Sequence, residues 1–207
     1  MVSGNVSFYN QTKEVGIKPT PSIGGVGLIK DYTKMISMDL KQVDNLVLII
    51  GKTEGHIDQS LFAWTILDEK NGPPPEVNLF NEKNNGESIL NLIDKGYVKS
   101  AHDISLGGLL VAISKMCIKG NKGIKISKSK NLINEIEYFF AEDQGRYLIE
   151  INKEDLKEVT KILNKNSVHH EELGIIIQND MIINEKTKVT IDELKSHYTN
   201  WLTKYMS

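Results

Sequence analysis

The sequence predicts an α+β fold in which helices cover a mixed β-sheet. Three observations indicate this class. Short apolar runs bounded by polar residues are typical of strands, longer stretches with an apolar residue every three or four positions are typical of helices, and the two kinds alternate irregularly. A regular strand–helix alternation would instead have predicted a doubly wound parallel sheet.

Two of the expected strands have clear patterns. Asp44–Lys52 is a continuous apolar run with polar ends, which indicates a buried strand. Gly145–Ile151 alternates apolar and polar residues, as a half-buried strand does. The other expected strands are Ser22–Lys30, Tyr97–His102, Gly123–Ser127, Glu172–Gln178 and Met181–Asn184. We expect the last two to form a hairpin across Asn179-Asp180.

The expected helices are recognised by apolar faces and by their end signals. Gly107–Ile118 is apolar on most faces, which predicts a buried helix. Thr190 is a good N-cap for a last helix that ends near Tyr205. The remaining expected helices are His56–Lys70, stopped by a glycine and three prolines, then Glu82–Lys95, Asn131–Glu137 and Glu154–Lys165.

Composition excludes several classes of protein. The 207 residues carry 25 basic and 27 acidic side chains, a net charge of −2, which gives no electrostatic basis for binding nucleic acid or an anionic membrane. The longest apolar runs, such as Leu46–Ile50, are too short to span a bilayer, and no signal peptide follows Met1. The single cysteine, Cys117, excludes a disulfide framework. We therefore expect a cytoplasmic protein.

Three segments could carry chemistry. In Ser3–Ser7, glycine would let the backbone approach a phosphate, and the asparagine would offer an amide oxygen of the kind Mg²⁺ accepts; alternatively it is a solvated loop. In Ala101–Leu109, a Gly-Gly pair opening a helix could bind an anion, with His102 as a titrating group; alternatively Asp103 or Ser105 caps the helix and His102 is structural.

The third segment is Phe140–Arg146, which holds two acidic residues and the only arginine of the chain. Arginine presents a planar fork of donors, so Arg146 could bind a phosphate. The simpler interpretation is an intramolecular ion pair that fixes the loop. Cys117 lies on an apolar helix face, which favours core packing over nucleophilic catalysis.

Five motifs follow one another along the chain: SGNVSFYN, PTPSIGGVGLIKD, AHDISLGGLLVAISKM, AEDQGRYLIEI and WLTKYM. In this order and spacing they resemble the C-terminal part of the phosphoribosylformylglycinamidine synthase family, over nearly the whole chain. That family belongs to the PurM-like superfamily, related to aminoimidazole ribonucleotide synthetase. The resemblance implies a PurM-like C-terminal domain: a mixed sheet of about six strands flanked by helices on both faces, in three α/β/α layers.

The resemblance also implies a domain division and site residues. Residues 1–21 would be the remnant of a second N-type domain with its linker, and residues 22–207 the C-type domain. The family converts formylglycinamide ribonucleotide, ATP and glutamine-derived ammonia to formylglycinamidine ribonucleotide, with Mg²⁺. Carried over by position, Gly4 would contact ATP, Asn5 would bind Mg²⁺ and Ser7 would contact the ribonucleotide. The implied protein partners are a glutaminase subunit, a small accessory subunit and the remainder of the synthetase chain.

Two departures bear on activity. The family's catalytic histidines and most acidic Mg²⁺ ligands lie in a first N-type domain that this sequence does not contain, so we expect no catalytic residue here and no turnover by the chain alone. Related sequences often have Gly-Gly-Ser where this one has Ile57–Ser60, which argues against phosphate binding there. Two alternatives stay open: a free-standing PurM-like nucleotide-binding or interaction module, and a selenophosphate or hydrogenase-maturation type of synthetase, which SGNVSFYN disfavours.

Overall fold

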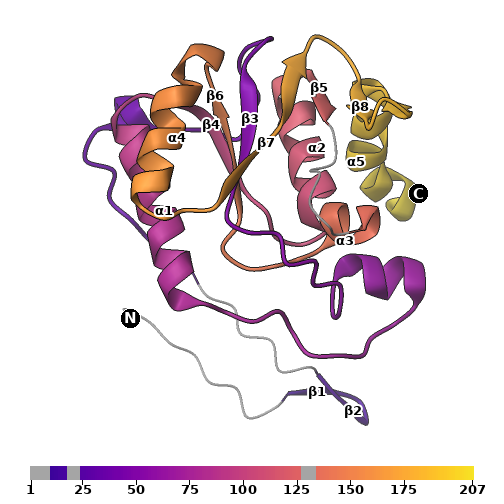
Figure 1. Ribbon diagram of the computed structural model, residues 1–207. Coiled ribbons are helices and arrows are strands. Elements are labelled where there is room, and N and C mark those ends of the chain that lie inside the picture. The colour runs from indigo at the N-terminus through magenta and orange to yellow at the C-terminus, as the bar shows by residue number, and fades with distance from the viewer. Residues whose placement is uncertain (1–9, 18–23, 127–133) are drawn as a thin grey trace. The chain divides into compact units, whose positions relative to one another are not determined.

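The computed structural model describes residues 10–17, 24–126 and 134–207 (Figure 1). The chain forms two compact units, residues 1–32 and 33–207. In the first unit, Gln11–Thr12 (β1) and Val15–Gly16 (β2) pair antiparallel. The strand expected at Ser22–Lys30 is not found over its described part, residues 24–30. Three glycines give this stretch little side-chain surface to pack, and Val26 and Leu28 are almost fully exposed.

The second unit is built on one seven-stranded mixed sheet with the order β4-β6-β3-β7-β5-β8-β9. Only the β5–β8 pair is parallel. The strands are β3 (Leu46–Ile50), β4 (Val98–Asp103), β5 (Gly123–Ile126), β6 (Tyr147–Ile151), β7 (His170–Ile177), β8 (Met181–Ile183) and β9 (Thr187–Val189). The predicted mixed sheet is confirmed, and the short strand β9 is an addition at its edge.

The hairpin expected across Asn179-Asp180 is wrong. β5 lies between β7 and β8, so that Lys125 is paired with Ile175 on one side and Ile182 on the other. The connection between β7 and β8 passes the start of β5, where the Ile124 N–H donates to the Asp180 carbonyl (3.0 Å). A side chain at Gly123 would collide with that carbonyl, which explains the glycine at this position. β8 instead pairs antiparallel with β9.

Helices cover both faces of the sheet, giving the expected three layers (Figure 1). The helices are α1 (Leu79–Asp94), α2 (Gly108–Gly120), α3 (Glu135–Phe140), α4 (Leu156–Lys165) and α5 (Ile191–Met206). The central strand shows why both faces are apolar: Val47 and Ile49 pack with α2, α3 and α5, whereas Leu48 and Ile50 pack with α1 and α4. The described helices include none that is long and apolar enough to cross a membrane.

The helix expected over His56–Lys70 is much shorter in the structure. Helical structure covers only residues 61–67, of which Ala63–Leu67 (η2) is a π-helix. On both sides of this helical segment a residue has left-handed backbone conformation: Gln59 with φ 60° and Asp68 with φ 54°. The Gln59 side-chain amide donates to the carbonyls of Lys70 and Gly72 (both 3.1 Å). The segment is therefore a closed loop rather than a long helix.

Candidate functional site

Two of the three candidate segments, Ala101–Leu109 and Phe140–Arg146, meet at one end of the sheet. The third, Ser3–Ser7, lies outside the described residues. Gly4, Asn5 and Ser7 lie outside the described residues. The turn of residues 141–146 leads into β6, and it lies between the loop that follows β3 and the loop that follows β4. At this end of the sheet, Glu142, Asp143 and Arg146 bind groups of both loops.

Asp143 fills an anion-binding loop with its own carboxylate. The backbone N–H groups of Glu54 and Gly55 donate to its Oδ2 (3.0 and 3.1 Å), and the N–H of His56 donates to its Oδ1 (3.0 Å). Successive backbone N–H groups that point at one spot form a site that favours an anion. Here the chain supplies that anion itself, and Asp143 is almost completely buried.

Glu142 does the same at the start of α2. Its Oε1 accepts hydrogen bonds from the N–H groups of Leu61 (2.7 Å) and Gly107 (2.8 Å), which open the 61–67 segment and α2. A carboxylate at two helix N-termini is favourable because it satisfies free N–H groups and opposes the helix dipoles. Neither Asp103 nor Ser105 caps α2 through its side chain, contrary to the sequence-based alternative. The turn is architectural, with Glu142 in the place where an external anion could have bound.

Arg146 completes the same turn from inside the fold. Its guanidinium is buried and donates to the carbonyl of Ala141 (2.6 Å), the Thr53 hydroxyl (3.1 Å) and the carbonyl of Asp143 (3.3 Å). It also lies 3.7 Å from the Asp143 carboxylate. Burial lowers the pKa of Arg146, and the charge of Asp143 opposes that shift. The intramolecular interpretation is confirmed, because the guanidinium donates within its own turn and to Thr53 in the loop after β3.

His102 is a half-buried side chain on β4. Its Nδ1 lies 3.1 Å from the Asp103 carboxylate, which is largely exposed. Burial lowers the pKa of His102, while Asp103 acts in the opposite direction.

Cys117 is buried on α2, and burial raises the pKa of its thiol to about 12, so the thiol is unreactive at neutral pH.

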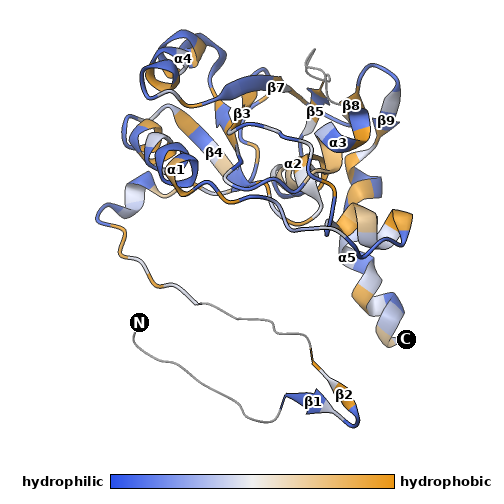
Figure 2. Ribbon diagram, turned by 60° about the horizontal axis from the view of Figure 1, so that its bottom comes forward, coloured by the Kyte–Doolittle hydropathy of each residue, from blue (hydrophilic) through white to orange (hydrophobic). Residues whose placement is uncertain are grey.

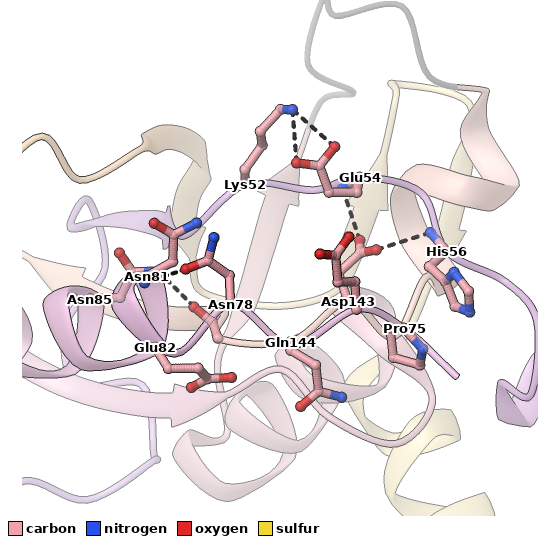
Figure 3. Close-up of a pocket in the computed structure, with 12 residues that line it drawn as sticks. Lys52, Glu54, His56, Pro75, Asn78, Asn81, Glu82, Asn85, Asp143 and Gln144 are labelled. Carbon is pink, nitrogen blue, oxygen red and sulfur yellow. Dashed lines mark hydrogen bonds and ion pairs between the residues drawn. The ribbon is translucent and has the colours of Figure 1, made fainter. Parts of the chain in front are cut away.

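A polar pocket of about 450 Å³ opens beside the Asp143 turn (Figure 3). Three asparagines at the start of α1 line it: Asn78, Asn81 and Asn85. The Asn78 side chain accepts from the Asn81 N–H (3.0 Å), and Asn85 donates to the Gly145 carbonyl (2.9 Å). The i, i+3, i+7 spacing places the three amides on one helix face. That spacing is visible in the sequence and is the signal from which this polar helix face could have been predicted.

The charged groups of the pocket are partly paired. At its rim, Lys52 Nζ lies 2.8 Å from the Glu54 carboxylate, and the His56 ring is 3.0 Å from the Pro73 carbonyl. A smaller hollow of about 260 Å³ adjoins the same turn and shares Glu82, Asp143, Gln144 and Gly145 with the pocket. It is lined by Tyr147, whose pKa is raised by burial and by the nearby carboxylates of Glu82 and Asp103.

This arrangement suits binding better than catalysis. Side-chain amides can donate and accept, so the pocket can hold a polar group through hydrogen bonds. In the described part of the chain, no three His, Cys, Asp or Glu side chains are grouped so that they could hold a metal ion. The pocket likewise lacks a histidine–carboxylate pair for proton transfer, since His56 is bonded to a carbonyl.

The chain is similar over its whole length to two curated relatives. It is 68% identical over 206 residues to the phosphoribosylformylglycinamidine synthase subunit PurL of Pelagibacter ubique, and 39% identical over 206 residues to that of Bartonella henselae. In each case the match covers 100% of this chain and 28% of the relative. The chain thus spans little more than a quarter of the length of these relatives.

Solved structures with the same fold include Thermotoga maritima PurL in three forms. PurL complexed with FGAR matches with a TM-score of 0.65 at 19% identity, covering 79% of this chain and 30% of that one. PurL complexed with ATP matches with a TM-score of 0.61 at 17% identity (79% and 27%). A structure of PurLQS matches with a TM-score of 0.60 at 20% identity (79% and 28%).

Residues 42–184 match the family described as AIR synthase related protein, C-terminal domain. The matched region begins just before β3 and ends just after β8, so it contains the central strands and the whole Asp143 turn. The chain therefore belongs to the AIR synthase related protein family, as its C-terminal domain.

Proposed function

We propose that this chain acts as the C-terminal part of the ATP-dependent ligase that converts formylglycinamide ribonucleotide, ATP and glutamine-derived ammonia to formylglycinamidine ribonucleotide in cytoplasmic purine biosynthesis. The observation that carries the proposal is the 68% identity to one PurL subunit along the full chain. Such similarity along the whole chain, including the parts on both sides of the family match, supports a shared role as well as a shared fold.

The ligand-binding part of the proposal lies in residues 1–21, the proposed remnant of an N-type domain; residues 22–207 are proposed as the C-type domain. Gly4 would contact ATP, Asn5 would bind Mg²⁺ and Ser7 would contact the ribonucleotide. An asparagine oxygen fits Mg²⁺ chemically, but one such ligand is not a site. The described residues offer no group of acidic side chains to complete it, so further ligands would come from the rest of the enzyme. Bound Mg²⁺ would neutralise charge on the transferring phosphoryl group.

The described domain would serve as a scaffold in this enzyme. Its two backbone anion sites are occupied by Asp143 and Glu142, and its pocket holds hydrogen-bonding amides without a proton-transfer pair. The catalytic groups would therefore come from the remainder of the synthetase chain. A glutaminase subunit would supply the ammonia, and a small accessory subunit would complete the assembly.

A turnover assay tests this division of labour. The purified 207-residue chain is incubated with formylglycinamide ribonucleotide, ATP, Mg²⁺ and an ammonium salt, and ADP release is followed. We expect no rate above that of a heat-denatured sample. Sustained, substrate-dependent ADP release would contradict the proposal, because the chain would then hold a complete active site.

The second candidate function is a free-standing module that binds a nucleotide or another protein without catalysis. The amide-lined pocket of about 450 Å³ favours it, since such groups could hold a base or a ribose. Isothermal titration with ATP and Mg²⁺ separates the two candidates. Micromolar binding that is lost in Asn81→Ala supports the module, whereas the absence of binding supports the dependent domain.

A further inference from the structure

The polar pocket at the start of α1 contains an acceptor that no described residue uses. Asn85, only 7% exposed, lines this pocket of about 450 Å³, and its side-chain NH₂ group donates to the Gly145 carbonyl (2.9 Å). Among the described residues, none donates to the Asn85 oxygen. Since no buried side-chain oxygen in this part of the chain lacks a hydrogen-bond partner, the Asn85 oxygen is accessible from the pocket. A ligand with an N–H group could therefore bond to it.

Glu82 brings a carboxylate to the same helix face. It lies three residues before Asn85, so the two side chains are neighbours on α1. The carboxylate lies against the turn, because a Cβ atom at Gly145 would be 3.3 Å from it. It has no ion pair or hydrogen bond with any described residue. Figure 3 shows Glu82 and Gln144 extending to the same side of the turn. Glu82 and Asn85 together offer three acceptor oxygens.

The charge of the pocket favours a cation. Of the described residues, only Lys52 brings an ammonium group to the lining, and Glu54 pairs with it at 2.8 Å. Asp143 is already bound by three backbone N–H groups. Glu76 and Glu82 have no opposite charge paired with them in the described part of the chain. This balance favours a cation over a phosphate, and therefore over ATP.

The adjoining hollow of about 260 Å³ adds a further carboxylate and an aromatic ring. Asp103 and Tyr147 line it, and it shares Glu82 with the pocket. Burial and then the carboxylates of Glu82 and Asp103 raise the pKa of Tyr147, so both carboxylates act on its hydroxyl. Arg146 also lines this hollow, but its guanidinium is buried and bonded within the fold. A cation here would have negative charge and an aromatic face nearby.

We propose that the pocket binds a guanidinium group, held by the Glu82 carboxylate and the Asn85 oxygen next to the hollow lined by Tyr147. A guanidinium is planar and carries five N–H donors, so it can serve all three acceptor oxygens. An ammonium group lacks the planar fork that pairs with a carboxylate. The site is independent of the proposed ligase activity, because none of its residues is assigned to ATP, Mg²⁺ or the ribonucleotide.

Isothermal titration of the 207-residue chain tests the site and the source of the group. L-arginine should bind with a dissociation constant of about 1 mM or below. L-citrulline, which has nearly the same shape without the charge, should bind at least tenfold more weakly. Acetyl-arginine methylamide presents the side chain as a polypeptide does. Tighter binding of this capped form assigns the site to an arginine of another polypeptide, and tighter binding of L-arginine assigns it to the free amino acid.

Substitutions on α1 test the residues that hold the ligand. Glu82→Gln keeps the shape but removes the charge, and it should weaken binding of the tighter arginine probe at least tenfold. The matched control is Glu87→Gln, on the same helix but outside the pocket lining, which should leave the constant within twofold. Circular dichroism checks that both variants are folded.

Three results would overturn the proposal: no binding of either arginine probe at about 5 mM, equal binding of L-citrulline, or equal effects of the two substitutions. The measurement is of binding and not of turnover, so a negative result here leaves the proposed ligase function standing.

Discussion

Arg146 holds the carbonyl of Asp143 with its Nε (3.3 Å), and one of its terminal nitrogens lies 3.7 Å from the Asp143 carboxylate. The two side chains bind different groups: the Asp143 carboxylate accepts from backbone N–H groups, and the Arg146 guanidinium donates to oxygen atoms. Asp143 faces the N–H groups of residues 54–56, and Arg146 faces the carbonyl of Ala141 and the hydroxyl of Thr53. One short turn thereby fixes the loop after β3 through both an anion and a cation.

Replacing Arg146 by lysine should destabilise the fold by about 3 kcal/mol. Lysine keeps the charge but loses the planar fork that serves three acceptors at once. Urea unfolding followed by circular dichroism measures the change. Lys83→Ala is the control, because its 3.8 Å contact with Glu87 is exposed and should contribute less than about 1 kcal/mol. A stability loss for Arg146→Lys no larger than that of the control would contradict the account.

Removing the Asp143 side chain should turn the loop into a site for an external anion. In Asp143→Ala the N–H groups of Glu54, Gly55 and His56 lose their acceptor, and the buried Arg146 loses its counter-charge. We expect sulfate to raise the melting temperature of this variant by several degrees over sodium chloride of equal ionic strength. The wild-type chain and the exposed-site control Glu76→Ala should gain several degrees less from sulfate, because it acts on them only through its general stabilising effect. Equal responses of all three proteins would mean that Asp143 does not occupy an anion site.

Glu150 is a second internal carboxylate, fully buried on β6, and its replacement by glutamine should cost about 3 kcal/mol. Its oxygens accept from the N–H groups of Lys41 and Gln42 and from the side chains of Asn45 and Ser100. Glutamine has nearly the same shape but would point an NH₂ group at some of these donors. Chemical unfolding should show a much smaller loss for Glu154→Gln, which is exposed. Similar losses for both variants would refute the hydrogen-bonding argument.

His102 should make the fold less stable as the pH falls. Burial holds its folded-state pKa below the ordinary value of 6.5, so the unfolded chain binds the proton more readily. Its contribution is therefore fully present above about pH 6.5 and is lost as the pH falls through the folded-state pKa. The difference in unfolding free energy between wild type and His102→Gln should shrink between pH 7.5 and 5.5. A steeper pH dependence in His102→Gln than in the wild type would contradict this expectation.

Local patterns in the sequence predicted much of the fold. β3 was predictable because both of its faces are buried, which demands a continuous apolar run. The start of α5 was predictable because Thr190 caps it through the Glu193 N–H (3.1 Å). The hairpin was mispredicted because the insertion of β5 between β7 and β8 depends on a contact with a strand about fifty residues earlier.

The candidate site was less predictable than the fold. The sequence identified Glu142, Asp143 and Arg146 as one segment, but their partners lie far away along the chain. Asp143 binds N–H groups 87 to 89 residues before it, and Glu142 binds one that is 81 residues away. Backbone donors of this kind have no residue signature. The roles of Gly4, Asn5 and Ser7 stay predictions from the family resemblance.

The measurement that tests the central claim most directly is the activity of a chimera. The corresponding part of the 68% identical Pelagibacter ubique PurL is replaced by this chain, and amidine formation is assayed with ammonia as the nitrogen source. We predict a rate within about tenfold of the unaltered PurL, and a loss of at least a hundredfold when Asn5→Ala is added to the chimera. A folded chimera without activity, or one indifferent to Asn5→Ala, would contradict the proposed function or the assigned metal ligand, respectively.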